Sequence, residues 1–356
     1  ALTIASYLKK NGYRTISNGK ISHFAKDASY GWDDMFRSSR NNPKDYQDPL
    51  NIKNLKNNFG PASEFINNDD IDYSDGKVTK KTIEDIQSIN KNDKPYFIAV
   101  GFQKPHLPFI APKKYWDLYD RNDISLPLNN FYPPSAPQKA NYFYELRKFT
   151  DIPDNGPISD DKAKELIHAY YACVSFIDAQ IGLILAELDN QGLTDSTTVV
   201  LTSDHGFSLS EHGRWTKHNL FQYELKIPMI ISSPKYKKNK TSESFVELVD
   251  LYPTFCDIAG LEIPDFVQGK SLIDNLKNPK KITSDIAFSI WQNGETLISN
   301  KYYYTEWSRK GSVMRRMLYD IENDELQMNN IAEIKTNKPI VDSLSIILNK
   351  HIKSIK

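Results

Sequence analysis

Cysteine is scarce in this chain: among its 356 residues only Cys173 and Cys256 occur. Each lies in an apolar stretch with helical character, AYYACVSFIDAQIG and LYPTFCDIAG. A free cysteine in such surroundings behaves as a small buried hydrophobic residue, so we expect neither a disulfide nor a catalytic thiol. The chemistry of this protein therefore has to come from other side chains.

The chain also has no excess of charge of one sign and no long apolar run. Its 45 basic and 45 acidic residues give a formal net charge of zero, whereas a nucleic-acid-binding surface is normally clearly basic. No run of about 18 apolar residues is present, so we expect no membrane span. The length and the 39% of hydrophobic residues suit one large globular domain with a small one.

The N-terminus has neither an initiator methionine nor a signal peptide. Leu2, Ile4, Ala5 and Leu8 have the spacing of one apolar helix face, which Asn11-Gly12 would close. The sequence thus begins directly with a helix that has an apolar, core-facing side. We expect native sequence upstream of Ala1.

Apolar strands alternate with helices over most of the chain, which is typical of a mostly parallel sheet covered by helices on both faces. We predict strands at 13–18, 95–101, 197–202 and 227–232, and helices at 80–90, 160–191 and 245–260. Two polar stretches, 25–78 and 123–158, are predicted to be long loops. From residue 283 short alternating strands and a helix at 338–352 predict a small antiparallel sheet. The expected domains are 1–282 and 283–356.

Polar side chains follow three of the predicted strands. Lys20 with His23, Lys104 with His106, and Asp204 with His205 each come directly after a strand. Beyond the third strand lie further polar and aromatic residues, namely His212, Arg214, Trp215, Lys217 and His218. The carboxyl ends of parallel strands meet at one edge of a sheet. We therefore expect an anion-binding site in which lysines supply charge, histidines donate protons and a carboxylate binds a metal.

Five sequence motifs resemble a type I sulfatase, and most of all the iduronate-2-sulfatase-like enzymes. They are Lys20 with His23, KPHLPF at 104–109, SDHG at 203–206 with EHG at 211–213 and Lys217, DLYPTFCDIAGL at 250–261, and LYDIENDELQMNNIA at 318–332. The resemblance runs from residue 1 to about residue 335. It implies an alkaline-phosphatase-like α/β fold with a small C-terminal subdomain. It also implies hydrolysis of a sulfate ester on a sugar or polysaccharide beside a calcium ion.

The resemblance assigns roles residue by residue. Asp204 and His205 would bind Ca2+, although calcium usually takes oxygen ligands. Lys20 and Lys217 would hold sulfate oxygens, and His106 would protonate the leaving alcohol. His23 would orient or deprotonate the nucleophile. Expected substrate contacts are Lys104, Lys217, His212, Arg214, Trp215 and His218; for His212, Arg214 and His218 a structural role is an equal alternative, and for Trp215 packing is the commoner one.

The nucleophile of such sulfatases is a formylglycine, made from Cys or Ser in a Cys/Ser-x-Pro/Ala-x-Arg motif. A formylglycine-generating enzyme or an anaerobic sulfatase-maturating enzyme performs that conversion. Neither Cys173 nor Cys256 is followed by this motif, and the resemblance places the motif and two metal-binding aspartates upstream. We expect no turnover from this polypeptide alone, and a periplasmic or secreted location for the whole protein.

Two other functions remain open. A phosphodiesterase or phosphonate hydrolase of the same superfamily would share the fold but usually binds two metals with more Asp and His ligands. A non-catalytic, truncated glycan-binding relative would bind sugar without turnover. The single Asp-His pair and the site lysines favour one metal and a sulfate.

Overall fold

The computed structural model describes residues 2–24, 26–38, 44–89, 94–142, 144–236, 239–309 and 312–355. The chain divides into two compact units. The first unit comprises Ala1–Leu126 and Glu145–Thr197, and the second comprises Pro127–Tyr144 and Thr198–Lys356. The predicted boundary at residue 282 lies inside the second unit, just ahead of its four-stranded sheet.

The first unit contains a three-stranded parallel sheet in the order β2-β1-β4. Its strands are β1 (Arg14–Gly19), β2 (Asp34–Phe36) and β4 (Tyr96–Gly101), and α1 (Ile4–Lys10) leads into β1. Thr3 caps α1 by accepting the Ser6 N–H, and Ala5 and Leu8 are buried, as the apolar spacing indicates. In the parallel register Gly19 lies opposite Gly101, so β1 and β4 end at the same edge.

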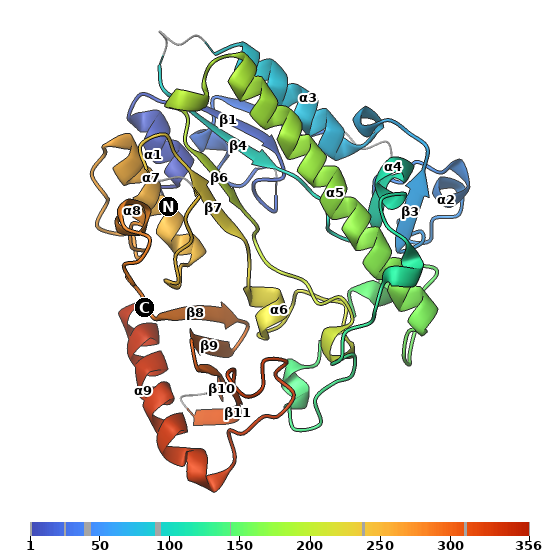
Figure 1. Cartoon of the computed structure of the whole chain (residues 1–356), viewed down its shortest axis with the longest axis vertical. Helices are drawn as coiled ribbons and strands as arrows, with labels where there is room; N and C mark the ends of the chain where they lie inside the picture. The colour runs from blue at the N-terminus through green and yellow to red at the C-terminus, as the bar shows by residue number, and fades with distance from the viewer. Residues whose placement is uncertain are drawn as a thin grey trace. The chain divides into compact units, whose positions relative to one another are not determined.

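Two long helices of the first unit, α3 (Ser74–Gln87) and α5 (Asp160–Asn190), lie side by side (Figure 1). The predicted helix 160–191 is confirmed, whereas α3 begins earlier than the predicted residue 80. By length and composition alone α5 is apolar enough to cross a membrane. The core helix of a soluble protein has the same composition, so this is weak evidence for a span.

The prediction of one long loop over 25–78 is wrong for the described part of that stretch. It contains β2, α2 (Pro49–Lys53), β3 (Ser63–Ile66) and the start of α3. β3 pairs in parallel with β5 (Phe109–Pro112), which α4 (Lys113–Trp116) follows. Elements of three to five residues are too short to show a hydrophobic period, so the polar composition dominated the interpretation. Residues 25 and 39–43 of the stretch lie outside the described ranges.

In the second unit, β6 (Val199–Thr202) and β7 (Met229–Ser232) form an antiparallel pair, contrary to the parallel arrangement predicted for them. A parallel pair needs a crossover, usually a helix of a dozen or more residues. Between these strands the structure has only two short helical segments, a 3-10 turn at Glu211–Gly213 and the four-residue helix α6 (Gln222–Leu225). The chain therefore returns beside β6 in the opposite direction.

The C-terminal antiparallel sheet is confirmed, with the order β11-β10-β9-β8. Its strands are β8 (Ile286–Trp291), β9 (Gly294–Ser299), β10 (Tyr302–Arg309) and β11 (Ser312–Asp320). Helix α9 (Lys338–Ser354) packs on this sheet (Figure 1), and Leu344 and Leu348 are buried with Tyr304 and Leu318. Two shorter helices, α7 (Leu251–Ala259) and α8 (Ile273–Lys277), come before it. The helix predicted at 245–260 begins later in the structure, at Leu251, with Pro253 in the first turn of α7.

Candidate active site

Lys20 directly follows β1, at the sheet edge where β1 and β4 end. Its backbone N–H donates to the Gly101 carbonyl over 2.7 Å. Gly19 has φ +81°, and a Cβ at this position would lie 2.1 Å from the Gly101 carbonyl oxygen, so only glycine allows this approach. His23 is exposed, with its ring edge-on to Phe24 at 4.6 Å. The first two predicted clusters therefore follow strands that end at one edge.

The loop after β4 is fixed by a carboxylate that the sequence did not reveal. Asp75, buried in the first turn of α3, accepts the backbone N–H groups of Gln103 and Lys104, each over 2.9 Å. Burial raises the pKa of Asp75, while these two N–H groups and the Lys104 charge favour its ionised form. The Lys104 ammonium donates to the Pro108 carbonyl over 2.7 Å and is largely buried. Through this hydrogen bond the Lys104 side chain stabilises its own loop.

His106 stands on the same loop, about one-third exposed. Its Nδ1 lies 2.6 Å from the Leu107 carbonyl oxygen. Because a carbonyl only accepts, Nδ1 carries the proton. Its Nε2 lies 3.5 Å from Oε1 of Glu145. An imidazole with a fixed tautomer and a carboxylate neighbour is the arrangement of a general acid or base.

Asp204 and His205 follow β6 in the second unit. The Asp204 side chain is 65% exposed, and its Oδ1 lies 3.6 Å from Nε2 of His205. The His205 Nδ1 is 2.7 Å from the Gly206 carbonyl oxygen and carries the proton, so Nε2 is the nitrogen on the Asp204 side. Both groups therefore present metal-binding atoms together.

These two residues alone do not fit a calcium ion. Calcium takes six to eight oxygen ligands, and here the donors are one carboxylate and one imidazole. Within the ranges that the structure describes, no group of three or more His, Cys, Asp or Glu side chains is placed to hold a metal. The Ca2+ site stays a prediction and needs further ligands.

His212 and Arg214, predicted as substrate contacts, are buried in the second unit, 0% and 1% exposed. The Arg214 guanidinium donates to the Ala140 carbonyl over 3.0 Å and lies 3.3 Å from Glu224 Oε1. It also donates to His212 Nδ1 over 3.2 Å, while His212 Nε2 donates to the Leu326 carbonyl over 2.8 Å. This network gives both residues the structural role that the sequence left as an alternative. Trp215, at 4% exposed, is likewise part of the interior.

The buried network predicts an acid-sensitive histidine. Burial, with the adjacent Arg214 charge, lowers the pKa of His212 to about 4 from 6.5. As the pH falls from about 6.5 to about 4, the unfolded chain binds a proton at His212 that the folded chain does not, so stability falls. The full effect is about 3 kcal/mol.

NMR titration of the imidazole signals measures this directly. We expect the His212 resonance to titrate near pH 4. A midpoint for His212 above about pH 6 would contradict the buried, Arg214-bonded geometry.

Lys217 and His218 are half-buried in the second unit. The His218 ring stacks on Trp291 with centroids 4.9 Å apart, and it meets Tyr142 edge-on at 5.0 Å. These rings border a pocket of about 240 Å³. The structure thus places the predicted substrate contact His218 at a cavity.

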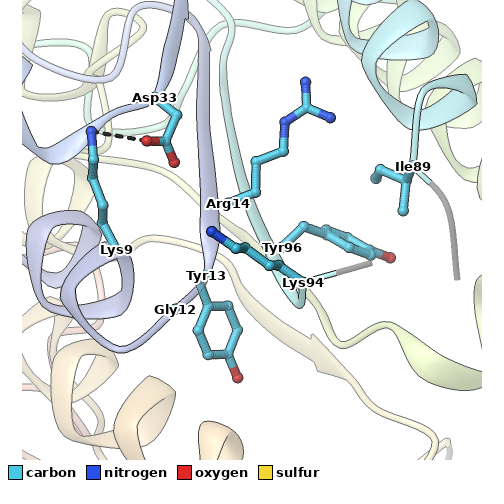
Figure 2. A pocket seen from close by; sticks show the side chains of 8 residues that line it. All are labelled: Lys9, Gly12, Tyr13, Arg14, Asp33, Ile89, Lys94 and Tyr96. Atoms are coloured by element: carbon cyan, nitrogen blue, oxygen red, sulfur yellow. Dashed lines mark ion pairs between the residues drawn. The ribbon is translucent and has the colours of Figure 1, made fainter. Parts of the chain in front are cut away.

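A second cavity, of about 550 Å³, lies at the opposite end of β1 and β4, where Arg14 and Tyr96 begin these strands. Figure 2 shows Lys9 beside Asp33 in this cavity, 3.0 Å apart, with the Arg14 and Lys94 side chains. None of the predicted site residues lines it. Although this cavity is the larger of the two, it contains none of the predicted site residues, so the candidate site stays at the other end of the sheet.

The predicted site residues are divided between the two units. The first unit holds Lys20, His23, Lys104 and His106, and the second holds Asp204, His205, Lys217 and His218. The sequence missed Asp75, Glu145 and Glu224, which position Lys104, His106 and Arg214. No motif signals them, because their partners are distant in the sequence. The convergence of all three clusters stays a prediction.

Comparison with known families finds two matching sequence models. The model described as Sulfatase matches residues 2–261, and the model described as N-sulphoglucosamine sulphohydrolase, C-terminal, matches residues 210–354. The chain is 30% identical over 310 residues to iduronate 2-sulfatase of Homo sapiens, which covers 74% of this chain and 55% of that protein. The chain therefore spans about half the length of this relative.

Solved structures share the fold over nearly the whole chain. A protein in complex with its substrate D-glucosamine-2-N,6-O-disulfate has a TM-score of 0.77 at 20% identity, covering 99% of this chain and 82% of its own. Phosphonate monoester hydrolase from Silicibacter pomeroyi has a TM-score of 0.78 at 19% identity, covering 99% of this chain and 80% of its own. At these identities the likeness concerns the fold alone, and it confirms the alkaline-phosphatase-like α/β class.

Proposed function

This chain belongs to the sulfatase family, and we propose that the whole protein is an iduronate-2-sulfatase-like sulfuric ester hydrolase that acts on a sulfated sugar or polysaccharide. The observation that carries the proposal is the placement of Lys20, His106 and Asp204 just beyond strands β1, β4 and β6 of a sulfatase-family chain, with Lys217 farther along the segment that follows β6. Water is consumed, the S–O bond to the sugar breaks, and the sugar oxygen takes up a proton as sulfate leaves.

Each residue has a distinct part in this proposal. Lys20 and Lys217 bind sulfate oxygens and offset the charge that gathers there in the transition state. The doubly protonated His106 ring donates its Nε2 proton to the leaving sugar oxygen and keeps the Nδ1 proton on the Leu107 carbonyl, while the Glu145 carboxylate beside Nε2 favours the protonated ring. His23 orients or deprotonates the nucleophile, and Asp204 with His205 contributes to a Ca2+ site completed by other ligands.

We expect the nucleophile to lie outside this sequence. Cys173 is buried, and burial raises the pKa of its thiol to about 12, so it stays protonated. Cys256 is also buried and free, and burial raises the pKa of its thiol too. A formylglycine, installed upstream by a formylglycine-generating or anaerobic sulfatase-maturating enzyme, would supply the hydroxyl that attacks sulfur. A periplasmic or secreted location, where sulfated polysaccharides are met, is part of the same proposal.

The test is sulfate release by the natural protein purified from its source, with ion chromatography as readout and a 2-O-sulfated uronate disaccharide as substrate. We expect sulfate release, an aldehyde-bearing peptide in its mass map, and no release by residues 1–356 alone. Release of phosphonate instead of sulfate from matched esters would replace the proposal by a phosphonate hydrolase. Sugar binding without any release would indicate a glycan-binding relative.

A further inference from the structure

The pocket beside His218 is built from parts of the second unit that are far apart in sequence. Tyr142 precedes β6, His218 follows it, and Trp291 ends β8. The His218 ring lies between the other two, stacked on Trp291 at 27° and perpendicular to Tyr142 at 78°. The three rings form a continuous aromatic wall. We call this cavity the aromatic pocket.

The hairpin between β8 and β9 fixes Trp291 in this wall. Trp291 pairs with Gly294 across a two-residue turn, in which Gln292 has a left-handed φ of +54°. A Cβ on Gly294 would lie 2.7 Å from Trp307 Nε1, so glycine lets the turn pack on the buried Trp307. A non-glycine residue in this backbone region marks a turn that its surroundings hold in place. Trp291 is therefore a pre-positioned ring that is still 38% exposed.

The rim of the aromatic pocket is polar and carries positive charge. The exposed Lys139 ammonium donates to Gln292 Oε1 over 3.3 Å, and Asn141 adds a further amide group. No aspartate or glutamate is among the described residues that line the pocket. Its volume of about 240 Å³ is below the usual range for drug-sized ligands, about 300–1,000 Å³, and suits a single ring. Aromatic faces, amides and one ammonium match a sugar ring that bears an acidic group.

We propose that the aromatic pocket binds one pyranose ring of the substrate against Trp291, with an acidic substituent of that ring facing Lys139. The proposal rests on the proposed function, because His218 directly follows Lys217, the lysine assigned to sulfate. Adjacent residues have Cα atoms about 3.8 Å apart. The pocket is therefore lined by the segment that directly follows the lysine assigned to sulfate. The pocket sets which acidic sugar is accepted.

The test measures binding and turnover in the natural protein with the substitutions Trp291→Ala and Lys139→Met. Matched controls are Phe266→Ala and Lys280→Met, which change an exposed aromatic ring and an exposed lysine outside the pocket. Near-UV circular dichroism verifies folding of each variant. The probes are a 2-O-sulfated uronate disaccharide, its carboxyl-reduced form, and the sulfate-free uronate disaccharide.

We expect Trp291→Ala to raise the calorimetric Kd of all three probes about tenfold, because an aromatic contact with the ring is lost. Lys139→Met should raise Kd about fivefold for probes with the carboxylate and leave the carboxyl-reduced probe unchanged. If the loss follows sulfate instead of carboxylate, the acidic group facing Lys139 is a sulfate, and the pocket assignment stands.

The inference is overturned if the natural protein releases sulfate while both pocket variants bind every probe like the controls. A second result would distinguish the pocket proposal from the proposed sulfatase activity. Binding that depends on Trp291 without any sulfate release would reject the proposed function and retain the pocket as an acidic-sugar site.

Discussion

Substitution His106→Ala in the natural protein is expected to lower kcat on a sulfated sugar about a hundred- to ten-thousand-fold, with KM nearly unchanged. A sugar alkoxide is a poor leaving group and needs a proton as the S–O bond breaks. The His106 ring is suited to supply it, since the Leu107 carbonyl fixes its tautomer and Glu145 faces its other nitrogen. Removing the ring removes the proton donor and leaves the sulfate-binding lysines in place.

The leaving group provides the decisive measurement. With 4-nitrophenyl sulfate, whose phenolate leaves without protonation, the same variant should retain most of its kcat. His351→Ala is the matched control, because His351 lies on α9 and stacks on Phe288, remote in sequence from the proposed site. An equal loss on the sugar and the aryl sulfate would show that His106 does not act as the acid.

Glu145 is a positioning residue in this scheme, acting on the reaction only through His106. We expect Glu145→Gln to lower kcat on the sugar sulfate about tenfold and to spare the aryl sulfate. A purely structural role would lower both alike. The same pair of substrates therefore also separates these two roles of Glu145.

The sequence was sufficient where a long element has a regular period. Helix α5 and the four strands from β8 to β11 were predicted because their apolar residues recur at the spacing of a helix or alternate as in a strand. The polar ends of β1, β4 and β6 were also recognisable, since each apolar run stops at charged residues. These local patterns require no knowledge of distant partners.

Distant partners decide what the sequence did not reveal. The direction of β7 depends on the absence of a crossover helix, which only the folded connection of 26 residues shows. Asp75 and Glu145 act on loops 28 and 39 residues away. His212 and Arg214 have the composition of a binding site, yet Glu224, Ala140 and Leu326 enclose them. Charge near a motif is therefore no evidence of exposure.

The burial of Arg214 has the largest expected effect on the stability of the protein. Its guanidinium lies 3.3 Å from Glu224 Oε1 with both side chains at 1% exposure or less, and it lies over the Phe221 ring at 4.4 Å. Arg214→Met would keep much of the volume but leave the Glu224 carboxylate buried without its counter-charge. Breaking such a pair on one side costs about 3–5 kcal/mol. Burial already raises the pKa of Glu224, which shows how costly its charge is there.

We expect Arg214→Met to lower the Tm of the second unit by about 10 °C, measured by scanning calorimetry. The double variant Arg214→Met with Glu224→Gln should recover much of this loss, because it removes the isolated charge as well. Lys301→Met is the control: its ammonium lies 3.8 Å from Glu322, both side chains are at least half exposed, and its loss should shift Tm far less. If Arg214→Met melts like the control, while sugar binding is lost, Arg214 is a substrate contact and the buried network does not exist in solution.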